Sequence, residues 1–204
     1  MPVEVEQKFC VREDTEARIR ALGGVCGGTA HIEDRYYDTG DHLLTSADLW
    51  LRRRDGHWQL KSPAAGSRGR TGIATQYRET ESESEIVSFS APCPPAASGL
   101  MVNQLVGVAP LLQEFAVIVT ERRVYELAGG LRVDLDWADF GHSLGEIEVM
   151  VDSEEEIPAA LAKIQDLARK LELEDGERQP GKMHAYLQRY RPCHLQRLLE
   201  AHVL

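Results

Sequence analysis

Short runs in which polar and apolar residues alternate recur along the chain and predict β-strands. The first run, Val3–Phe9, places Glu4, Glu6 and Lys8 on one face and two valines on the other, because successive side chains of a strand point to opposite sides. Neighbours on one face are roughly 7 Å apart, so the two carboxylates repel each other unless a cation lies between them. Taken alone, the run is most simply a strand with one dry and one solvated face. The alternative is part of a site for a hard divalent cation.

The charged alternation returns on later segments, where basic and acidic residues are separated by segment. Arg52 and Arg54 share one face of a run that is followed, after a turn at Asp55-Gly56, by a second run carrying Lys61. This arrangement predicts a basic β-hairpin. Three further predicted elements contribute one basic residue each: Arg78, Arg122 and Lys182.

Two acidic pairs show the same spacing. Asp134 with Asp136, and Glu146 with Glu148, are each two positions apart with an apolar residue between them. An open sheet would leave the charged faces in water and need cover only on its apolar side. A closed antiparallel barrel would instead direct all of them into one lumen. The pattern by itself leaves both architectures open.

Alternation and turn residues predict eight strands, a number that can close a barrel. They lie at residues 2–11, 29–38, 47–54, 57–62, 73–79, 116–127, 130–137 and 143–151. Apolar periodicity predicts helices at 14–22, 158–173, 182–191 and 194–203, the last two separated by Pro192, and one or two short helices within 100–112. The segments 62–72 and 91–99, rich in Gly, Ser or Pro, are predicted loops.

Length and charge narrow the possible functions. A chain of 204 residues, 43% of them apolar, can bury a substantial core, so one domain spanning 1–204 is expected. The formal net charge of −10 argues against a nucleic-acid surface. Basic residues gathered on a few strands instead suit a small, highly charged anion.

The cysteines and the N-terminal residues indicate a compartment. Cys10, Cys26, Cys93 and Cys193 are far apart in sequence and form no C-x-x-C pair, which argues against zinc and for a reducing environment. The first residues lack the basic and apolar regions of a signal peptide, and no apolar run is long enough to span a bilayer. We therefore expect a cytoplasmic protein with no membrane or nucleic-acid partner.

Five blocks, in this order along the chain, resemble the CYTH superfamily of triphosphate tunnel metalloenzymes: Glu4-x-Glu6-x-Lys8, Tyr36–Thr39, Leu51–Arg54, Arg132–Asp136 and Gly145–Glu148. Within it, the chain is most similar to the branch that hydrolyses thiamine triphosphate. The resemblance extends from about residue 2 to about residue 200. It implies an α+β fold in which an eight-stranded antiparallel β-barrel forms a triphosphate tunnel, with helices packed outside.

The resemblance also implies roles for individual residues. Metal binding falls to five carboxylates, with Mg²⁺, or else Mn²⁺, as the expected cofactor: Glu4, Glu6, Asp134, Glu146 and Glu148. Phosphate binding falls to six basic residues: Lys8, Arg52, Arg54, Lys61, Arg122 and Lys182. Arg78 is added to this substrate-binding set although it stands where the family has a lysine, because it keeps the charge with a planar, bidentate group.

The expected reaction is attack of water on the terminal phosphorus of thiamine triphosphate, which releases thiamine diphosphate and phosphate. Such an ester carries about four negative charges, so several cations must neutralise it. The resemblance suggests that Tyr36 and Lys61 activate the water, although Tyr36 is equally well explained as a wall aromatic. Trp50 shares the face of Arg52, where it either stacks on thiamine or fills the wall.

Other conspicuous residues have simpler expected roles. The seven histidines show no metal-binding spacing and are expected on the surface or in loops. Trp58 and Trp137 are expected to pack, and the acidic runs 79–85 and 154–156 to be solvated. Asp136 is either a weaker metal candidate than Asp134 or a structural partner.

Three functions are consistent with these sequence features. The first is Mg²⁺-dependent hydrolysis of thiamine triphosphate by a monomer. The second keeps the tunnel but acts on inorganic tripolyphosphate or RNA 5′-triphosphates, or cyclises a nucleotide. The third is a barrel that carries an anion without catalysis. The acidic net charge disfavours RNA, and aromatic residues beside the basic strand favour thiamine. Five metal-directed carboxylates exceed what anion carriage needs, because they repel an anion unless a metal is bound.

Overall fold

A computed structural model describes residues 2–64, 70–71, 73–89, 111–173 and 179–204. Within them the strands are β1 Val3–Phe9, β2 Val25–Asp38, β3 Trp50–Arg54, β4 His57–Pro63, β5 Arg70–Thr71, β6 Ala74–Thr80, β7 Gln113–Leu127, β8 Leu131–Ala138 and β9 Ser143–Val151. The helices there are α1 Thr15–Ala21, α2 Leu43–Ser46, α3 Glu83–Phe89, α5 Ile157–Lys170, α6 Lys182–Tyr190 and α7 Pro192–Glu200, with a short 3₁₀ helix, η2, at Glu154–Glu156.

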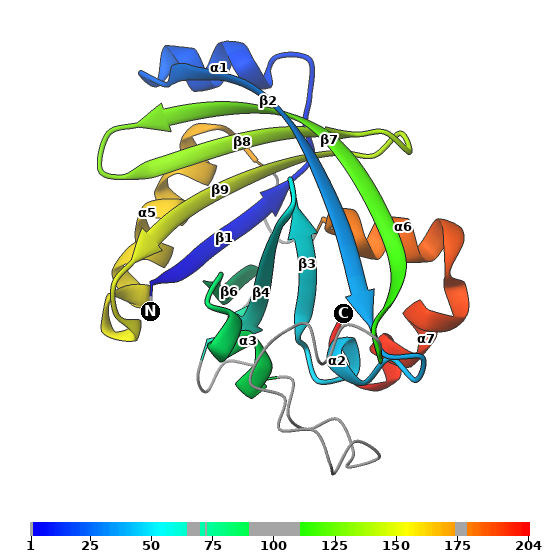
Figure 1. Cartoon of the computed structure of the whole chain (residues 1–204). Coiled ribbons are helices and arrows are strands. Elements are labelled where there is room, and N and C mark those ends of the chain that lie inside the picture. The colour runs from blue at the N-terminus through cyan, green and yellow to red at the C-terminus, as the bar shows by residue number, and fades with distance from the viewer. Residues whose placement is uncertain (1, 65–69, 72, 90–110, 174–178) are drawn as a thin grey trace.

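Eight of these strands close an antiparallel barrel (Figure 1). Hydrogen-bonded neighbours follow the order β1-β9-β8-β7-β2-β3-β4-β6, and β6 pairs back onto β1. The closing register places Glu4 opposite Tyr77 and Glu6 opposite Thr75. The two-residue strand β5 pairs with β6 at the side of the barrel. The predicted eight-stranded α+β barrel is confirmed, with β5 as an addition.

The inner and outer faces of the barrel differ in polarity. Val3 and Val5 of β1 are fully buried on the outer face, where they join Ile164 and Leu167 of α5 in an apolar core. Alternate residues of the same strand, such as Glu4, point into the lumen. Because side chains alternate along a strand, each strand supplies both an apolar layer beneath the helices and a polar interior. The main apolar core therefore lies outside the barrel wall.

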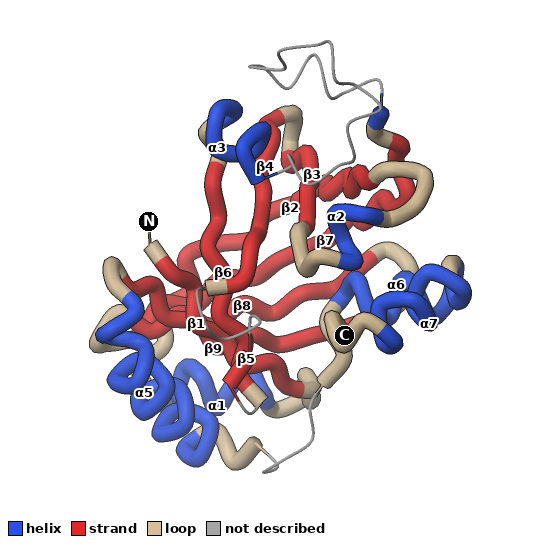
Figure 2. The backbone as a smooth tube through the Cα atoms, turned by 90° about the horizontal axis from the view of Figure 1, so that it is seen from below, coloured by secondary structure: helices blue, strands red, loops and turns tan. Residues whose placement is uncertain are grey.

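The C-terminal helices cover another part of the barrel, away from α5 (Figure 2). Leu187 of α6 and Leu198 of α7 pack with Trp50 of β3 and Phe115 of β7. Pro192 occupies the first turn of α7, where its missing N–H would have no intrahelical partner. It therefore starts this helix, two residues before the predicted beginning. No helix in the described part of the chain has the length and apolarity needed to cross a bilayer.

The predicted strands match the observed ones to within a few residues, and α1, α5, α6 and α7 coincide with predicted helices. The short helices α2 and α3 were not predicted; α2 has only four residues, too few to show a period. Of the predicted loop 62–72, the described residues extend β4 to Pro63 and form β5. The predicted loop 91–99 and residues 100–110 of the predicted short helices lie outside the described residues.

Candidate active site

A cavity of about 430 Å³ occupies the barrel and is lined by strands from around its wall and by the start of α6. Three aromatic residues line it: Tyr36, Trp50 and Tyr77. Its charged lining residues are Glu4, Glu6, Lys8, Arg52, Arg54, Lys61, Glu79, Arg122, Glu146 and Lys182. The barrel thus brings together all six basic residues that the resemblance assigns to phosphate.

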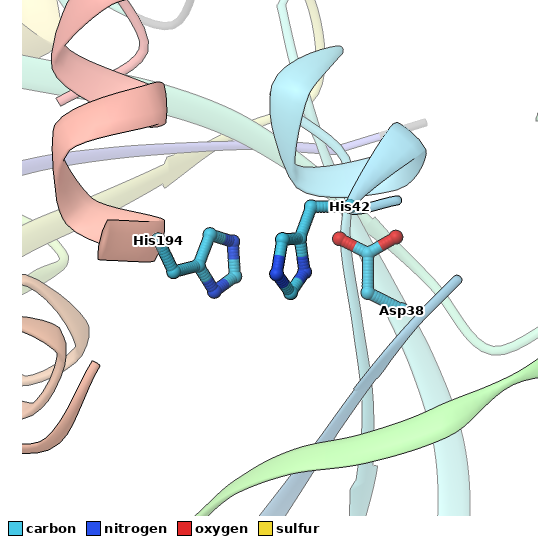
Figure 3. Close-up of side chains that lie close together, drawn as sticks. All are labelled: Asp38, His42 and His194. Atoms are coloured by element: carbon cyan, nitrogen blue, oxygen red, sulfur yellow. The ribbon is translucent and has the colours of Figure 1, made fainter. Parts of the chain in front are cut away.

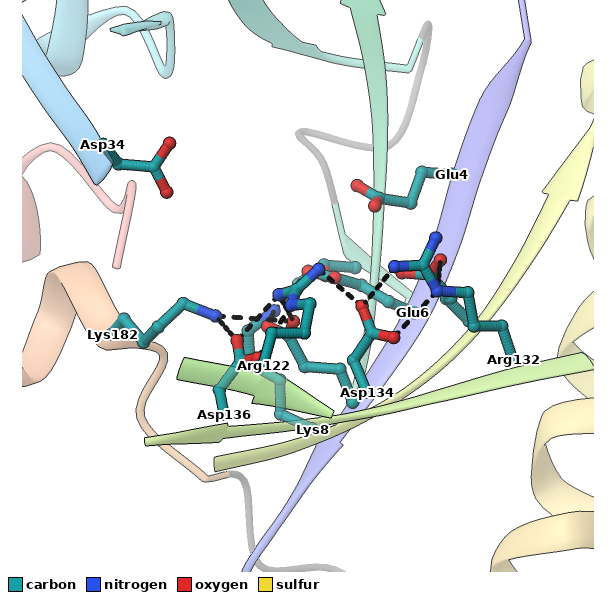
Figure 4. A network of polar contacts seen from close by, with 12 residues as sticks. Glu4, Glu6, Lys8, Asp34, Arg122, Arg132, Asp134, Asp136 and Lys182 are labelled. Carbon is teal, nitrogen blue, oxygen red and sulfur yellow. Dashed lines mark hydrogen bonds and ion pairs between the residues drawn. The ribbon is translucent and has the colours of Figure 1, made fainter. Parts of the chain in front are cut away.

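Arg122 of β7 lies among acidic side chains of β8 and β9 (Figure 4). It donates to both oxygens of Asp136 at 2.7 Å, and its guanidinium lies 2.5 Å from Asp134 and 2.9 Å from Glu146. Lys182, in the first turn of α6, also donates to Asp136 and lies 3.5 Å from Glu146. Burial would raise the pKa of Glu146, but Lys182 and the neighbouring cations outweigh it and hold this pKa well below its usual value.

A second group of ion pairs spans β2, β3 and β6. Arg54 binds both oxygens of Asp34, at 2.7 and 2.8 Å, and Arg52 lies 3.7 Å from the same carboxylate. Arg52 also donates to both oxygens of Glu79, at 3.0 and 3.1 Å. Asp34 is 2% exposed and Arg52 5%, so these pairs are largely desolvated. A polyanion in the lumen could replace carboxylates as partners of the same guanidinium groups.

Glu4, Glu6 and Glu148 form a three-carboxylate group in which one oxygen of each residue lies within 4.8 Å of the others. Burial, together with the nearby Glu4 and Asp134, raises the pKa of Glu148 to about 8. At neutral pH Glu148 is therefore largely protonated, because burial and the neighbouring carboxylates disfavour its charged form. Three converging carboxyl groups fit a hard divalent cation such as Mg²⁺, whose charge would favour the ionised form of Glu148.

Asp134 and Glu146, the other two predicted metal ligands, face the same lumen and have basic partners. Arg132 donates to both oxygens of Asp134, at 2.8 and 2.9 Å, and lies 3.3 Å from Glu148. Arg122 contacts both Asp134 and Glu146. All five predicted ligands thus contact basic side chains, since Lys61, Lys8 and Arg132 contact Glu4, Glu6 and Glu148 in turn. Of the five, Glu4, Glu6 and Glu148 converge in the three-carboxylate group.

Lys61 and Tyr36 line the cavity from β4 and β2. Lys61 donates to Glu4 and lies 4.0 Å from Glu79. Burial alone would lower the pKa of Lys61, but Glu4 and Glu6 outweigh burial and raise it. Lys61 therefore stays an ammonium at neutral pH. It can supply positive charge to a phosphate group, and its expected part, with Tyr36, in activating the water stays a prediction.

Trp50 and Tyr77 share one carboxylate at the cavity wall. Nε1 of Trp50 and the hydroxyl of Tyr77 each donate to Oδ1 of Asp48, at 2.9 Å. Trp50 is 8% exposed and also packs against Leu198 of α7. The two expectations for Trp50, wall residue and ligand contact, are therefore compatible, because one part of the ring system packs while another borders the cavity.

The register of β6 corrects two expectations. Tyr77 and Glu79 point into the lumen, so Arg78 between them points outward, where it donates to Glu154. Arg78 does not line the cavity and is not placed to bind a substrate there. Glu79, expected to be solvated, lines the cavity and pairs with Arg52. Both positions carry a charge, so composition alone could not decide which of the two faces inward.

Sequence reasoning also missed two partners in the lumen network, Asp34 and Arg132. A usable signal was present in both cases, because each lies two positions before a residue already assigned to the lumen, Tyr36 and Asp134 respectively. On a strand that spacing places the side chains on the same face. The described residues thus contain a larger network of ion pairs than the motifs alone indicate.

A second group of potential metal ligands, Asp38, His42 and His194, lies at α2 and α7 (Figure 3). The carboxylate of Asp38 accepts the N–H groups of Leu44 and Thr45, at 2.9 and 3.0 Å, and so holds α2. The two imidazole rings stack 3.7 Å apart with 11° between their planes. Their nitrogen lone pairs therefore lie in two nearly parallel planes, and one ion cannot lie in both planes. The expected surface location is wrong for His194, which is 4% exposed.

The fold and the cavity define a barrel protein built to hold a highly charged anion beside carboxylates that suit a metal ion. The chain belongs to the CYTH domain family, whose match covers residues 2–180. It is 43% identical over 209 residues to the thiamine-triphosphatase of Homo sapiens, an alignment that covers 97% of this chain and 90% of the human protein. It is 42% identical, with the same coverage, to the thiamine-triphosphatase of Macaca fascicularis.

Solved structures share the fold at lower sequence identity. A Pyrococcus horikoshii OT3 protein is 21% identical with a TM-score of 0.60, over 91% of this chain and 98% of that chain. A Hippeastrum protein, described as having a dominant triphosphatase activity, is 16% identical with a TM-score of 0.59, over 92% of this chain and 95% of that chain. These likenesses support the barrel architecture.

Proposed function

We propose that this chain hydrolyses thiamine triphosphate to thiamine diphosphate and phosphate inside the barrel, with Mg²⁺ as cofactor. One observation carries the proposal: six basic side chains line a single cavity beside the three-carboxylate group. The 43% identity to human thiamine-triphosphatase, over nearly the whole chain, supports the choice of thiamine triphosphate among possible polyanions.

The basic residues provide the electrostatic part of catalysis. A triphosphate ester brings about four negative charges into the lumen, where they must be neutralised before a nucleophile can approach. Charge-assisted hydrogen bonds from Lys and Arg are roughly twice as strong as neutral ones. In the free protein the same cations pair with lumen carboxylates such as Asp136 and Glu79, so phosphate oxygens exchange with carboxylates as their partners. Fixed cations then stabilise the charge that moves onto the leaving diphosphate.

The three-carboxylate group, Glu4, Glu6 and Glu148, is the proposed metal site. All three donors are carboxylate oxygens, which suit Mg²⁺ better than a thiophilic metal. A bound ion supplies further positive charge to the triphosphate oxygens. Burial, and after it repulsion from Glu4 and Asp134, raises the pKa of Glu148, and a divalent cation bound here would relieve that repulsion.

Tyr36 and Lys61 have distinct proposed roles near the reacting phosphate. Tyr36 lines the cavity beside Arg52, its partner in the β2–β3 register, and we assign it to hydrogen-bonding the attacking water. Lys61, held protonated by Glu4, attracts the negative charge that develops on phosphate oxygens. Trp50, with Tyr77 beside it, is the proposed contact for the cationic thiamine portion, which phosphate-binding cations cannot recognise.

Phosphate release from thiamine triphosphate, ATP and tripolyphosphate, with and without Mg²⁺, tests the proposal. We expect the highest kcat/KM on thiamine triphosphate with Mg²⁺ and loss of turnover in excess EDTA. Glu148→Gln should lose nearly all activity, whereas Glu155→Gln, an exposed carboxylate in η2, should keep it. Faster turnover of ATP or tripolyphosphate would reassign the substrate, and full activity in EDTA would exclude the metal.

The proposal also covers the cellular location, the domain organisation and the oligomeric state of the enzyme. Cys10, Cys26 and Cys193 are free thiols, which supports a reducing, cytoplasmic location. The barrel closes within one chain, which supports a single domain spanning residues 1–204, and we propose that this domain works as a monomer. Size-exclusion chromatography with light scattering tests the oligomeric state.

A further inference from the structure

The turn between β8 and β9, residues 139–142, contacts the segment that brings Lys182 into the cavity. Nε2 of His142 lies 3.1 Å from the carbonyl oxygen of Pro180, two residues before Lys182. A carbonyl only accepts, so Nε2 must carry the hydrogen and donate it. Pro180 itself lines the cavity, and this bond therefore fixes the chain immediately before α6 begins.

The same turn also contacts the middle and the last turn of α6. Phe140 meets the ring of Tyr186 edge-on, with the ring centroids 5.6 Å apart. Nη1 of Arg189 donates to the carbonyl oxygen of Phe140 at 2.5 Å. One turn thus contacts the residues before α6 and the second half of the helix, which restrains both the position and the direction of α6.

The turn is well suited to act as a fixed support. The N–H of Ala138 donates to the carbonyl of His142 at 2.8 Å, and the N–H of Gly141 donates to the carbonyl of Ala138 at 2.9 Å. Gly141 has φ +87°, a conformation that glycine adopts without strain. The N–H of Asp139 also donates to the carbonyl of Val119 in β7, at 2.9 Å.

The start of α6 lies close to a second lysine of the cavity. A Cβ on Gly181 would lie 3.1 Å from Cε of Lys8, so the backbone of α6 passes directly over a cavity lysine. Lys182 then reaches Asp136 and Glu146, which belong to the two strands that the turn connects. Because a lysine ammonium sits on a flexible four-carbon stem, its location depends on where the helix begins.

We propose that the β8–β9 turn positions Lys182 for the triphosphate, and that His142 is the positioning residue that fixes the start of α6. The inference rests on the proposed function only in that a triphosphate is the ligand of the cavity. His142 does not line the cavity, so it acts on the ligand through Pro180 and Lys182.

The test measures the affinity of the whole protein for inorganic tripolyphosphate by isothermal titration calorimetry, so it does not depend on turnover. His142→Ala should weaken binding by about two- to tenfold, the effect of one net hydrogen bond. His142→Gln, whose amide can donate to the same carbonyl, should restore most of the affinity. His31→Ala, which removes an exposed histidine on β2, is the matched control and should bind like the wild type.

A double-mutant cycle with Lys182→Met separates positioning from a general structural role. If His142 acts through Lys182, His142→Ala should have no further effect on affinity in the Lys182→Met background. An equal loss in both backgrounds would overturn the inference. If His142→Ala lowers the melting temperature by more than a few degrees, Phe140→Leu takes its place in the cycle with the same two outcomes. A wild-type protein that fails to bind tripolyphosphate would instead refute the proposed function and this inference with it.

Discussion

Replacing Trp50 by Leu should change substrate preference more than it changes catalysis. A cation–π contact with the thiazolium is worth about 0.5 to 2 kcal/mol, so kcat/KM for thiamine triphosphate should fall by about two- to thirtyfold. Tripolyphosphate has no thiamine portion, and its hydrolysis should be largely spared. Leucine is preferred to alanine because Trp50 also packs against α7, and removing a large buried aromatic side chain costs about 3 to 5 kcal/mol of stability.

The assay compares kcat/KM for the two substrates in wild-type protein, in Trp50→Leu and in Trp58→Leu. Trp58 lies on the next strand, where it packs edge-on against Tyr37 with centroids 4.9 Å apart, and it does not line the cavity. Its variant controls for the loss of a tryptophan from the same hairpin. Equal losses on both substrates in Trp50→Leu, in proportion to a lowered melting temperature, would show that Trp50 is only a packing residue.

Three further predictions concern charge. Glu148→Asn introduces a neutral and shorter side chain and should nearly abolish metal-dependent phosphate release, while circular dichroism shows a folded protein. Retained activity would show that Glu148 does not belong to the metal site. Arg54→Ala should lower kcat/KM about ten- to hundredfold, the effect of losing a charge-assisted contact of about 1.5 to 3 kcal/mol. Arg53→Ala is the control and should change kcat/KM little, because Arg53 is exposed. Similar losses in the two variants would show that the faces assigned to these residues are wrong. Burial and the stacked neighbouring imidazole lower the pKa of His194 from 6.5 to about 4. The His194 imidazole therefore binds a proton more readily in the unfolded chain than in the folded protein. The free energy of unfolding should therefore fall by about 3 kcal/mol as pH drops from 6.5 to 4. Urea unfolding of His194→Gln over the same pH range should lack this decrease.

Residue alternation was sufficient to predict most of the barrel. Each strand needs an apolar outer face beneath the helices and a polar face toward the lumen, so a period of two appears directly in the sequence. In β1 this period separates Val3 and Val5 from Glu4, Glu6 and Lys8, and the structure keeps that division. The start of β2 was missed because its first residues are exposed and carry no alternating burial.

Residue types alone did not determine which charges meet. Arg78 and Glu79 are adjacent, and only the pairing of β6 with β1 and β4 decides that Glu79 faces inward. Tertiary structure also decides that Arg122 of β7 reaches Asp134 of β8, a contact that no local spacing specifies.

The sequence by itself therefore determined the element types, the charged faces and most of the residues that line the cavity, because these depend on a local period and on residue chemistry. The tertiary structure decided which carboxylate pairs with which cation, which three carboxylates come together, and how the β8–β9 turn contacts α6. Those contacts join residues that are distant in sequence, as with Lys182 and Asp136. They depend on strand register and barrel closure, which no single segment encodes.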